Sequence, residues 1–150
     1  MVGYRVEAMK VKYQDNLKYK ILNRISNLRG NVVLRSDLSD LGGYRSISYA
    51  LKSLVTEEKL ARISFGVYAK TFESEYTGKY ILQGGFNAAA INALDRLGIK
   101  WDLTRAQKAY NEGKTTQVPV KPSIRLRSRC RRVFALGKSK LVYEEGIYAK

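Results

Sequence analysis

The sequence contains no histidine and only one cysteine, Cys130, among its 150 residues. Histidine is the commonest general base and, together with cysteine, the usual ligand of zinc, so a zinc site or a Cys-His catalytic pair is excluded in practice. One cysteine cannot form an internal disulfide, and Cys130 is expected to be a small buried apolar residue on a strand. The sequence therefore predicts no metal, no cofactor and a reducing compartment.

Long apolar runs and phosphate-binding loops are also lacking. No apolar stretch approaches the roughly 18 residues of a membrane helix, and neither a signal peptide nor a glycine-rich nucleotide loop is present. A tyrosine-nucleophile DNA strand-transfer site is the one enzyme class compatible with eleven tyrosines, but the tyrosines are expected at half-buried packing positions instead. The sequence predicts a cytoplasmic protein that is not an enzyme and has no membrane partner.

Acidic residues are few, with 13 Asp and Glu against 28 Lys and Arg, and the formal net charge is +15. Such a chain repels itself unless a polyanion is nearby. The excess lies at the two ends, because residues 1–35 carry +6 and residues 113–150 carry +8, whereas residues 36–70 carry +1 and residues 71–112 carry none. Nucleic acid is the expected partner; a cationic protein that masks an acidic enzyme or toxin is the alternative.

The segment between residues 31 and 70 has the pattern of a winged helix-turn-helix. A short apolar run and a short helix beginning near Ser36 are followed by Gly42 and Gly43, which are expected to supply the positive φ of a tight inter-helix turn. Two β-prone runs, Leu60–Ile63 and Val67–Lys70, flank a turn with glycine and predict a hairpin. This hairpin would be the wing, with Arg62 or Lys70 near the DNA backbone.

A helix ending at Thr56 is predicted from apolar residues spaced i, i+3, i+4, i+7 and i+8, which are Ile47, Ala50, Leu51, Leu54 and Val55. The opposite face carries basic, polar and aromatic side chains suited to base edges and phosphates, namely Arg45, Ser46, Ser48, Tyr49, Lys52 and Ser53. No acid lies between Arg45 and Thr56. The sequence predicts that this helix is the DNA-recognition helix.

The chain is expected to have an α+β fold, with an N-terminal winged helix-turn-helix followed by a small α/β C-terminal module with a basic, strand-rich end. The expected boundaries are an N-terminal extension or basic arm at 1–16, the winged domain at 17–71, a linker at 72–85 and the C-terminal module at 86–150. Helical spacing predicts further helices from Leu17 to Leu28, from Phe86 to Leu97 and from Thr104 to Asn111.

Alternation between residues 124 and 134 predicts a strand that carries arginines on one face and apolar or small residues on the other. Residues on one face of a strand repeat about every 6.6 Å, so such a row could follow a phosphate backbone without reading bases. The expected phosphate-binding residues are Arg125, Arg127, Arg129, Arg131 and Arg132. Alternatives are a solvated strand face, a docking surface for an acidic protein, and an RNA-binding surface with Phe134 and Tyr143 as stacking partners.

The run from Ile47 to Val55, followed by Leu60–Ile63 and Gly66–Tyr68, resembles the N-terminal domain of abortive-infection antitoxins of the AbiEi type and of related plasmid and phage regulators. A second block, Asn111 and then Gly113–Pro119, is similar to the Asn, Leu-Gly and Thr-Gln-Val-Pro signature of that family. Two features depart from the family pattern: the C-terminal module is short, and Gly43 with Tyr44 replaces the polar cap usual before the recognition helix.

The resemblance implies a winged-helix domain that binds operator repeats and represses its own operon, and a C-terminal module that helps counter a nucleotidyltransferase-type toxin. It places Arg45, Ser46, Ser48, Tyr49 and Lys52 on the recognition helix and Arg62 on the wing. The expectation is thus a sequence-selective DNA-binding repressor of a mobile genetic element. Its expected partners are double-stranded DNA, a toxin protein and a second copy of the chain.

Overall fold

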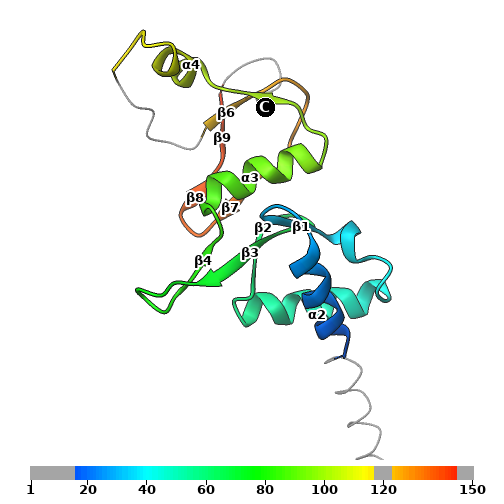
Figure 1. The fold of residues 1–150 in the computed structure, drawn as a ribbon. Coiled ribbons are helices and arrows are strands. Elements are labelled where there is room, and N and C mark those ends of the chain that lie inside the picture. Colours follow the sequence, from blue (N-terminus) through cyan, green and yellow to red (C-terminus); the bar gives the residue numbers. More distant parts are fainter. Residues whose placement is uncertain (1–15, 117–122, 145–150) are drawn as a thin grey trace, which may run out of the picture. The chain divides into compact units, whose positions relative to one another are not determined.

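The computed structural model of the chain describes residues 16–116 and 123–144 and has an α+β fold, as the sequence predicts (Figure 1). By its internal contacts the chain divides into two compact units. The first contains the described residues up to Arg62 together with Gly66–Gln83, and the second contains Ile63–Phe65 and the described residues from Gly84 onward. The expected basic arm, apart from residue 16, and Gln117–Pro119 of the family-like block lie outside the described residues.

The first unit is built around the amphipathic helices that the sequence predicts. Residues 16–27 are helical and are followed by β1 (Val32–Leu34), the 3-10 helix η1 (Arg35–Leu38) and α2 (Tyr44–Thr56). The apolar stripes of the two longer helices face each other and exclude water, so that burial of these side chains stabilises the unit. The core consists of Leu17, Ile21, Ile25, Val33, Leu38, Ile47, Ala50, Leu51, Leu54 and Leu60.

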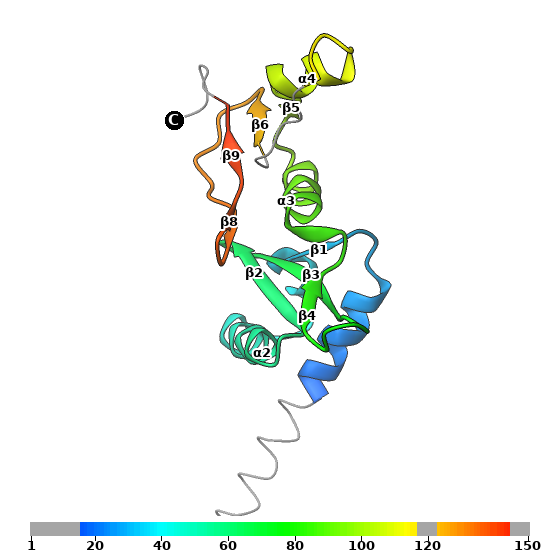
Figure 2. The ribbon, with the colours of Figure 1, turned by 90° about the vertical axis from the view of Figure 1, so that its left-hand side faces the viewer.

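A small sheet covers this core, in the strand order β1-β3-β2 (Figure 2). After α2 the chain forms β2 (Leu60–Ser64) and β3 (Val67–Glu73), joined by a tight turn in which Gly66 has φ +67°. β1 pairs antiparallel with β3, so that Val33 lies opposite Tyr68. Both side chains pack on the core between the helices. The predicted hairpin is therefore confirmed.

One local expectation is wrong in the first unit. Gly43 has φ −69° and ψ 159°, an extended conformation open to any residue, and it occupies the N-cap position of α2. Among the described residues, Gly42 and Gly43 are absent from the glycines with positive φ. The division between the two units, at Gln83 and Gly84, falls within the predicted linker at 72–85, and this segment also contains the end of β3 and the strand β4 (Tyr80–Leu82), which pairs antiparallel with β3.

The second unit begins with α3 (Gly85–Arg96), whose buried side is formed by Ala89, Ala90, Ala93 and Leu94. Small residues on one side allow other segments to approach the helix closely, and Gly98, with φ +74°, follows its C-terminus in the left-handed conformation that favours glycine. The remaining elements are β5 (Trp101–Asp102), α4 (Arg105–Asn111), β6 (Ser123–Leu126), β7 (Ala135–Leu136), β8 (Ser139–Lys140) and β9 (Val142–Tyr143).

The strand predicted between residues 124 and 134 is much shorter than expected. β6 ends at Leu126, since its antiparallel partner β5 offers only two residues, Trp101 and Asp102. β9 pairs with the other edge of β6 in parallel. The backbone N–H of Arg127 still donates to Lys100 O (2.9 Å), but beyond that point no strand continues as far as Phe134. The 6.6 Å row of four arginines is therefore not formed.

Within the residues that the structure describes, none of the helices has the length and apolar character needed to cross a bilayer.

Candidate nucleic-acid interface

The outer face of α2 is a narrow polar stripe opposite the core. Arg45, Tyr49, Lys52 and Thr56 are all exposed and are spaced i, i+4, i+7 and i+11. Residues at this spacing lie above one another on one side of a helix. Because Ile47, the alanine and the leucines fill the opposite face, the helix is held by its apolar side and presents two cations and an aromatic ring to solvent.

Arg35 supports the N-terminal end of this stripe. Its guanidinium carbon lies 3.8 Å from the centroid of the Tyr44 ring, and its Nη2 donates to Tyr44 O (2.7 Å) and to Ser48 Oγ (2.6 Å). Ser48 Oγ in turn donates to Tyr44 O (2.9 Å). The hydroxyl of Ser48, predicted to contact DNA, is thus engaged within the protein, whereas Arg35, which the sequence reasoning missed, orients the first turn of α2.

Lys18 lies at the other flank of α2. Its Nζ donates to Ser53 Oγ (3.1 Å) and forms an ion pair with Glu57. This ammonium group lowers the pKa of the Glu57 carboxyl from its usual range, and Lys59 adds to the effect. Ser53 therefore sits beside a cation that is already paired with a carboxylate, and Ser46, on the same flank, is half-buried. The three residues that project most directly are Arg45, Tyr49 and Lys52.

Arg62 and Lys70, the two cations predicted on the wing, have different environments. Arg62 is exposed on β2. Lys70, on β3, is half-buried, and its Nζ donates to Leu28 O (2.5 Å). Burial lowers the pKa of the Lys70 ammonium. Of the two, Arg62 is the exposed one, and Lys70 joins β3 to the end of the first helix.

The arginines of the second unit are exposed although the strand beneath them is short. Arg125, Arg127, Arg129 and Arg131 face solvent, while Ile124, Leu126 and Phe134 are buried, so the predicted in-out alternation persists through the irregular segment. Arg132 differs, since its Nη1 donates to Phe65 O (2.5 Å). Cys130 is buried as predicted, with its Sγ 3.8 Å from Tyr143 Oη, but it does not lie on a strand.

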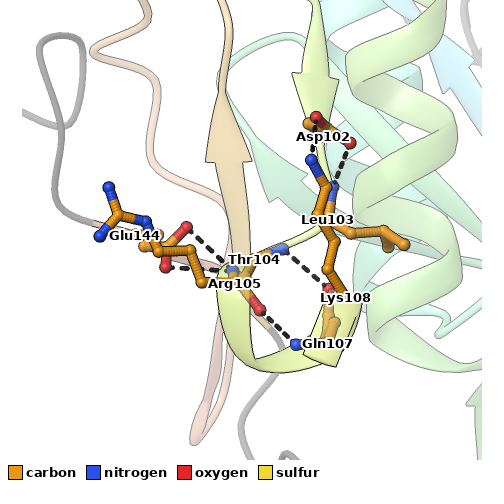
Figure 3. Close-up of polar contacts among 7 residues, drawn as sticks. All are labelled: Asp102, Leu103, Thr104, Arg105, Gln107, Lys108 and Glu144. Atoms are coloured by element: carbon orange, nitrogen blue, oxygen red, sulfur yellow. Dashed lines mark hydrogen bonds and ion pairs between the residues drawn. The ribbon is translucent and has the colours of Figure 1, made fainter. Parts of the chain in front are cut away.

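Carboxylates near these arginines are engaged at the start of α4 (Figure 3). Asp102 accepts from Lys108 Nζ (2.8 Å) and from the backbone of Leu103 (2.8 Å), and Lys108 lowers the pKa of this carboxyl. Both oxygens of Glu144 accept from the backbone N–H of Arg105 (3.2 and 3.3 Å). A capping box between Thr104 and Gln107 completes the helix start. Asp102 and Glu144 are thus both engaged in bonds with residues of α4.

No group of three or more Cys, Asp or Glu side chains that could hold a metal ion occurs in the described part of the chain. The expectation that the protein is not an enzyme and uses no cofactor stays a prediction.

Comparison with known proteins gives a single family match. The sequence model of a family of unknown function, DUF6088, matches residues 20–147. No curated protein and no solved structure matches the chain.

Proposed function

The chain belongs to the DUF6088 family of unknown function, and we propose that its first unit is a winged helix-turn-helix that binds double-stranded DNA, with α2 in the major groove. The order of elements supports this proposal: a helix, β1, η1, α2 and then the β2–β3 hairpin. The sheet order β1-β3-β2 is also the one that a winged helix requires. In this assignment η1 and α2 are the two helices of the helix-turn-helix.

The observation that carries the proposal is the exposed stripe of α2. A major groove about 12 Å wide admits one helix, and arginine or lysine is the commonest partner of guanine there. Arg45 and Lys52 supply such donors, and Tyr49 between them supplies an aromatic edge and a hydroxyl. From Tyr44 to Thr56 α2 contains no Asp or Glu, so no carboxylate on the helix repels the phosphates on either side of the groove.

Arg62 on β2 and the exposed arginines at 125, 127, 129 and 131 are assigned to phosphates. Phosphate contacts supply affinity that depends on salt but carries no sequence information. Most of these arginines lie on an irregular segment and not on a strand. Each is therefore assigned to a separate phosphate, and the contacts are not expected to be regularly spaced. Together with the AbiEi-like sequence blocks, this division of roles supports a transcriptional repressor of a mobile genetic element, whose second unit is available to a toxin protein.

Selection of bound duplexes from a random DNA library, at near-physiological salt and with excess competitor DNA, tests the proposal. We expect enrichment of one motif by the wild-type chain and by a control variant, Lys114→Ala. Lys114 carries the same charge as Arg45 but is paired with Glu112 beyond α4. Arg45→Ala should alter or abolish the enriched motif. Binding without enrichment that is lost as salt rises would instead indicate a nonspecific polyanion binder and would overturn the proposal.

A further inference from the structure

The hairpin formed by β3 and β4 carries an unusual concentration of exposed large apolar and aromatic side chains. The exposed fractions are 46% for Phe72, 97% for Tyr76, 41% for Tyr80 and 45% for Ile81. The sequence suggests half-buried tyrosines here, but Tyr76 lies in the turn between the strands and is almost fully exposed. A group of exposed apolar residues within one short hairpin is characteristic of an interaction site.

The pairing of the two strands places these side chains in register. Phe72 lies directly opposite Ile81, and Glu73 lies opposite Tyr80. Because side chains alternate between the faces of a sheet, Phe72 and Ile81 share one face and Tyr80 lies on the other. The face with Phe72 and Ile81 is therefore apolar, while the other face carries Tyr80 beside Glu73.

The outer edge of β4 presents backbone N–H and C=O groups that do not pair with β3. Gln83 N donates to Lys70 O (3.2 Å) and Ser74 N donates to Lys79 O (2.8 Å). In an antiparallel ladder every second residue points its N–H and C=O toward the same partner, so Ile81 faces β3 whereas Tyr80 and Leu82 face outward. In the described part of the chain β4 pairs with β3 alone. The strand contains no charge and no proline, the usual protections of an edge strand.

We propose that this edge pairs with the same edge of a second copy of the chain. An antiparallel β4–β4 pair with a two-fold axis at Ile81 brings Tyr80 opposite Leu82 of the other copy, where these residues exchange backbone hydrogen bonds. The two Ile81 side chains then meet as a non-hydrogen-bonded pair, the closer kind, with Phe72 beside each. Within β4 every cross-strand pair in this arrangement is then apolar on apolar, and Tyr80 of each copy meets Leu82 of the other, as the two-fold symmetry of an isologous interface requires.

The charge distribution also favours a second copy at this place. Two chains of net charge +15 repel each other over most of their surfaces. Residues 71–112 carry no net charge, and the hairpin itself has Glu73 and Glu75 against Lys79. A hairpin with so little net charge opposes the approach of a second copy less than the strongly basic segments of the chain do. This inference stands independently of DNA binding.

Sedimentation velocity of the full chain from about 1 µM to about 1 mM tests the pairing, since a small interface predicts a weak dimer. We expect a concentration-dependent monomer–dimer equilibrium. Ile81→Lys places two ammonium groups across the two-fold axis and should weaken association at least about tenfold. Tyr110→Lys is the matched control, because Tyr110 is 43% exposed on α4 and the charge change is the same.

Amide hydrogen exchange of the wild-type chain tests the same pairing without a substitution. The N–H groups of Tyr80 and Leu82 should become protected as concentration rises, while that of Ile81, bonded to β3, should not change. A chain that remains monomeric over the whole range would overturn the inference. Equal loss of association in Ile81→Lys and Tyr110→Lys, or exchange at Tyr80 and Leu82 that is independent of concentration, would also overturn it.

Discussion

The guanidinium of Arg35 stacks on the ring of Tyr44, 3.8 Å from its centroid, and donates to the carbonyl of the same residue. The residue that directly follows β1 thereby orients the first turn of the proposed recognition helix. A positioning role of this kind is invisible in the charge pattern, where Arg35 is one basic residue among 28.

Replacing Arg35 by lysine should separate this role from charge. Lysine keeps the cation but cannot form the same fork of donors or stack as a plane. We expect Arg35→Lys to lower the free energy of unfolding by about 1 kcal/mol, the size of a lost hydrogen bond or cation–π contact, and to weaken specific DNA binding. Urea denaturation measures the first effect. An unchanged denaturation midpoint would show that the contacts of Arg35 with Tyr44 and Ser48 contribute nothing to the stability of the protein.

Gly43 and Gly66 should respond in opposite ways to a side chain. Gly43 is the N-cap of α2 with extended φ, and a Cβ there meets nothing within 4 Å. Gly43→Ser should therefore stabilise the protein by a few tenths of a kcal/mol through capping. Gly66 has φ +67°, and Gly66→Ala should destabilise it by about 1 kcal/mol. Thermal melts of both variants compare the two effects, and a loss of stability in Gly43→Ser would contradict the assigned conformation.

The pair formed by Lys18 and Glu57 predicts a pH dependence of stability. Because the pKa of the Glu57 carboxyl is lowered from its ordinary value of 4.5 in the folded state, the pair stabilises the protein above that value and its contribution is lost as pH falls through the lowered pKa. Glu57→Gln should thus reduce the unfolding temperature at neutral pH slightly and flatten its decline below about pH 4.5. Parallel melts of wild type and variant that decline equally with pH would contradict this linkage.

The arginines assigned to phosphates should act on all DNA sequences alike. Removing Arg127 and Arg129 together should weaken binding to specific and unrelated duplexes by the same factor and lower the magnitude of the salt slope by about two, one for each contact. Fluorescence anisotropy titrations over a range of salt concentrations provide the slope. A selective loss on the specific duplex would assign these residues to base recognition instead.

The sequence predicts what depends on neighbouring residues and misses what depends on distant ones. The helix from Tyr44 to Thr56 is predictable because its apolar stripe lies within one segment. The strand expected up to Phe134 fails because its length is limited by β5, which has only two residues to offer. Alternation alone sets which side chains are buried, and this part of the prediction is confirmed at Ile124, Leu126 and Cys130.

The candidate site divides in the same way. The exposure of Arg45, Tyr49 and Lys52 follows from helical periodicity. Other features arise from contacts between segments 9 to 42 residues apart. Arg35 donates to Tyr44 O and to Ser48 Oγ, and Lys70 donates to Leu28 O. No local pattern reports such contacts, and Lys70 in particular has the same sequence surroundings as an exposed strand lysine.

The central claim, that α2 reads base edges, is tested most directly by the affinity of Arg45→Ala for the selected duplex and for a scrambled duplex. We expect the variant to lose about 5- to 150-fold on the selected duplex, corresponding to about 1–3 kcal/mol for one base contact. On the scrambled duplex it should lose no more than Lys114→Ala, which removes the same charge elsewhere. An equal loss by Arg45→Ala on both duplexes would contradict the claim and assign α2 to phosphates.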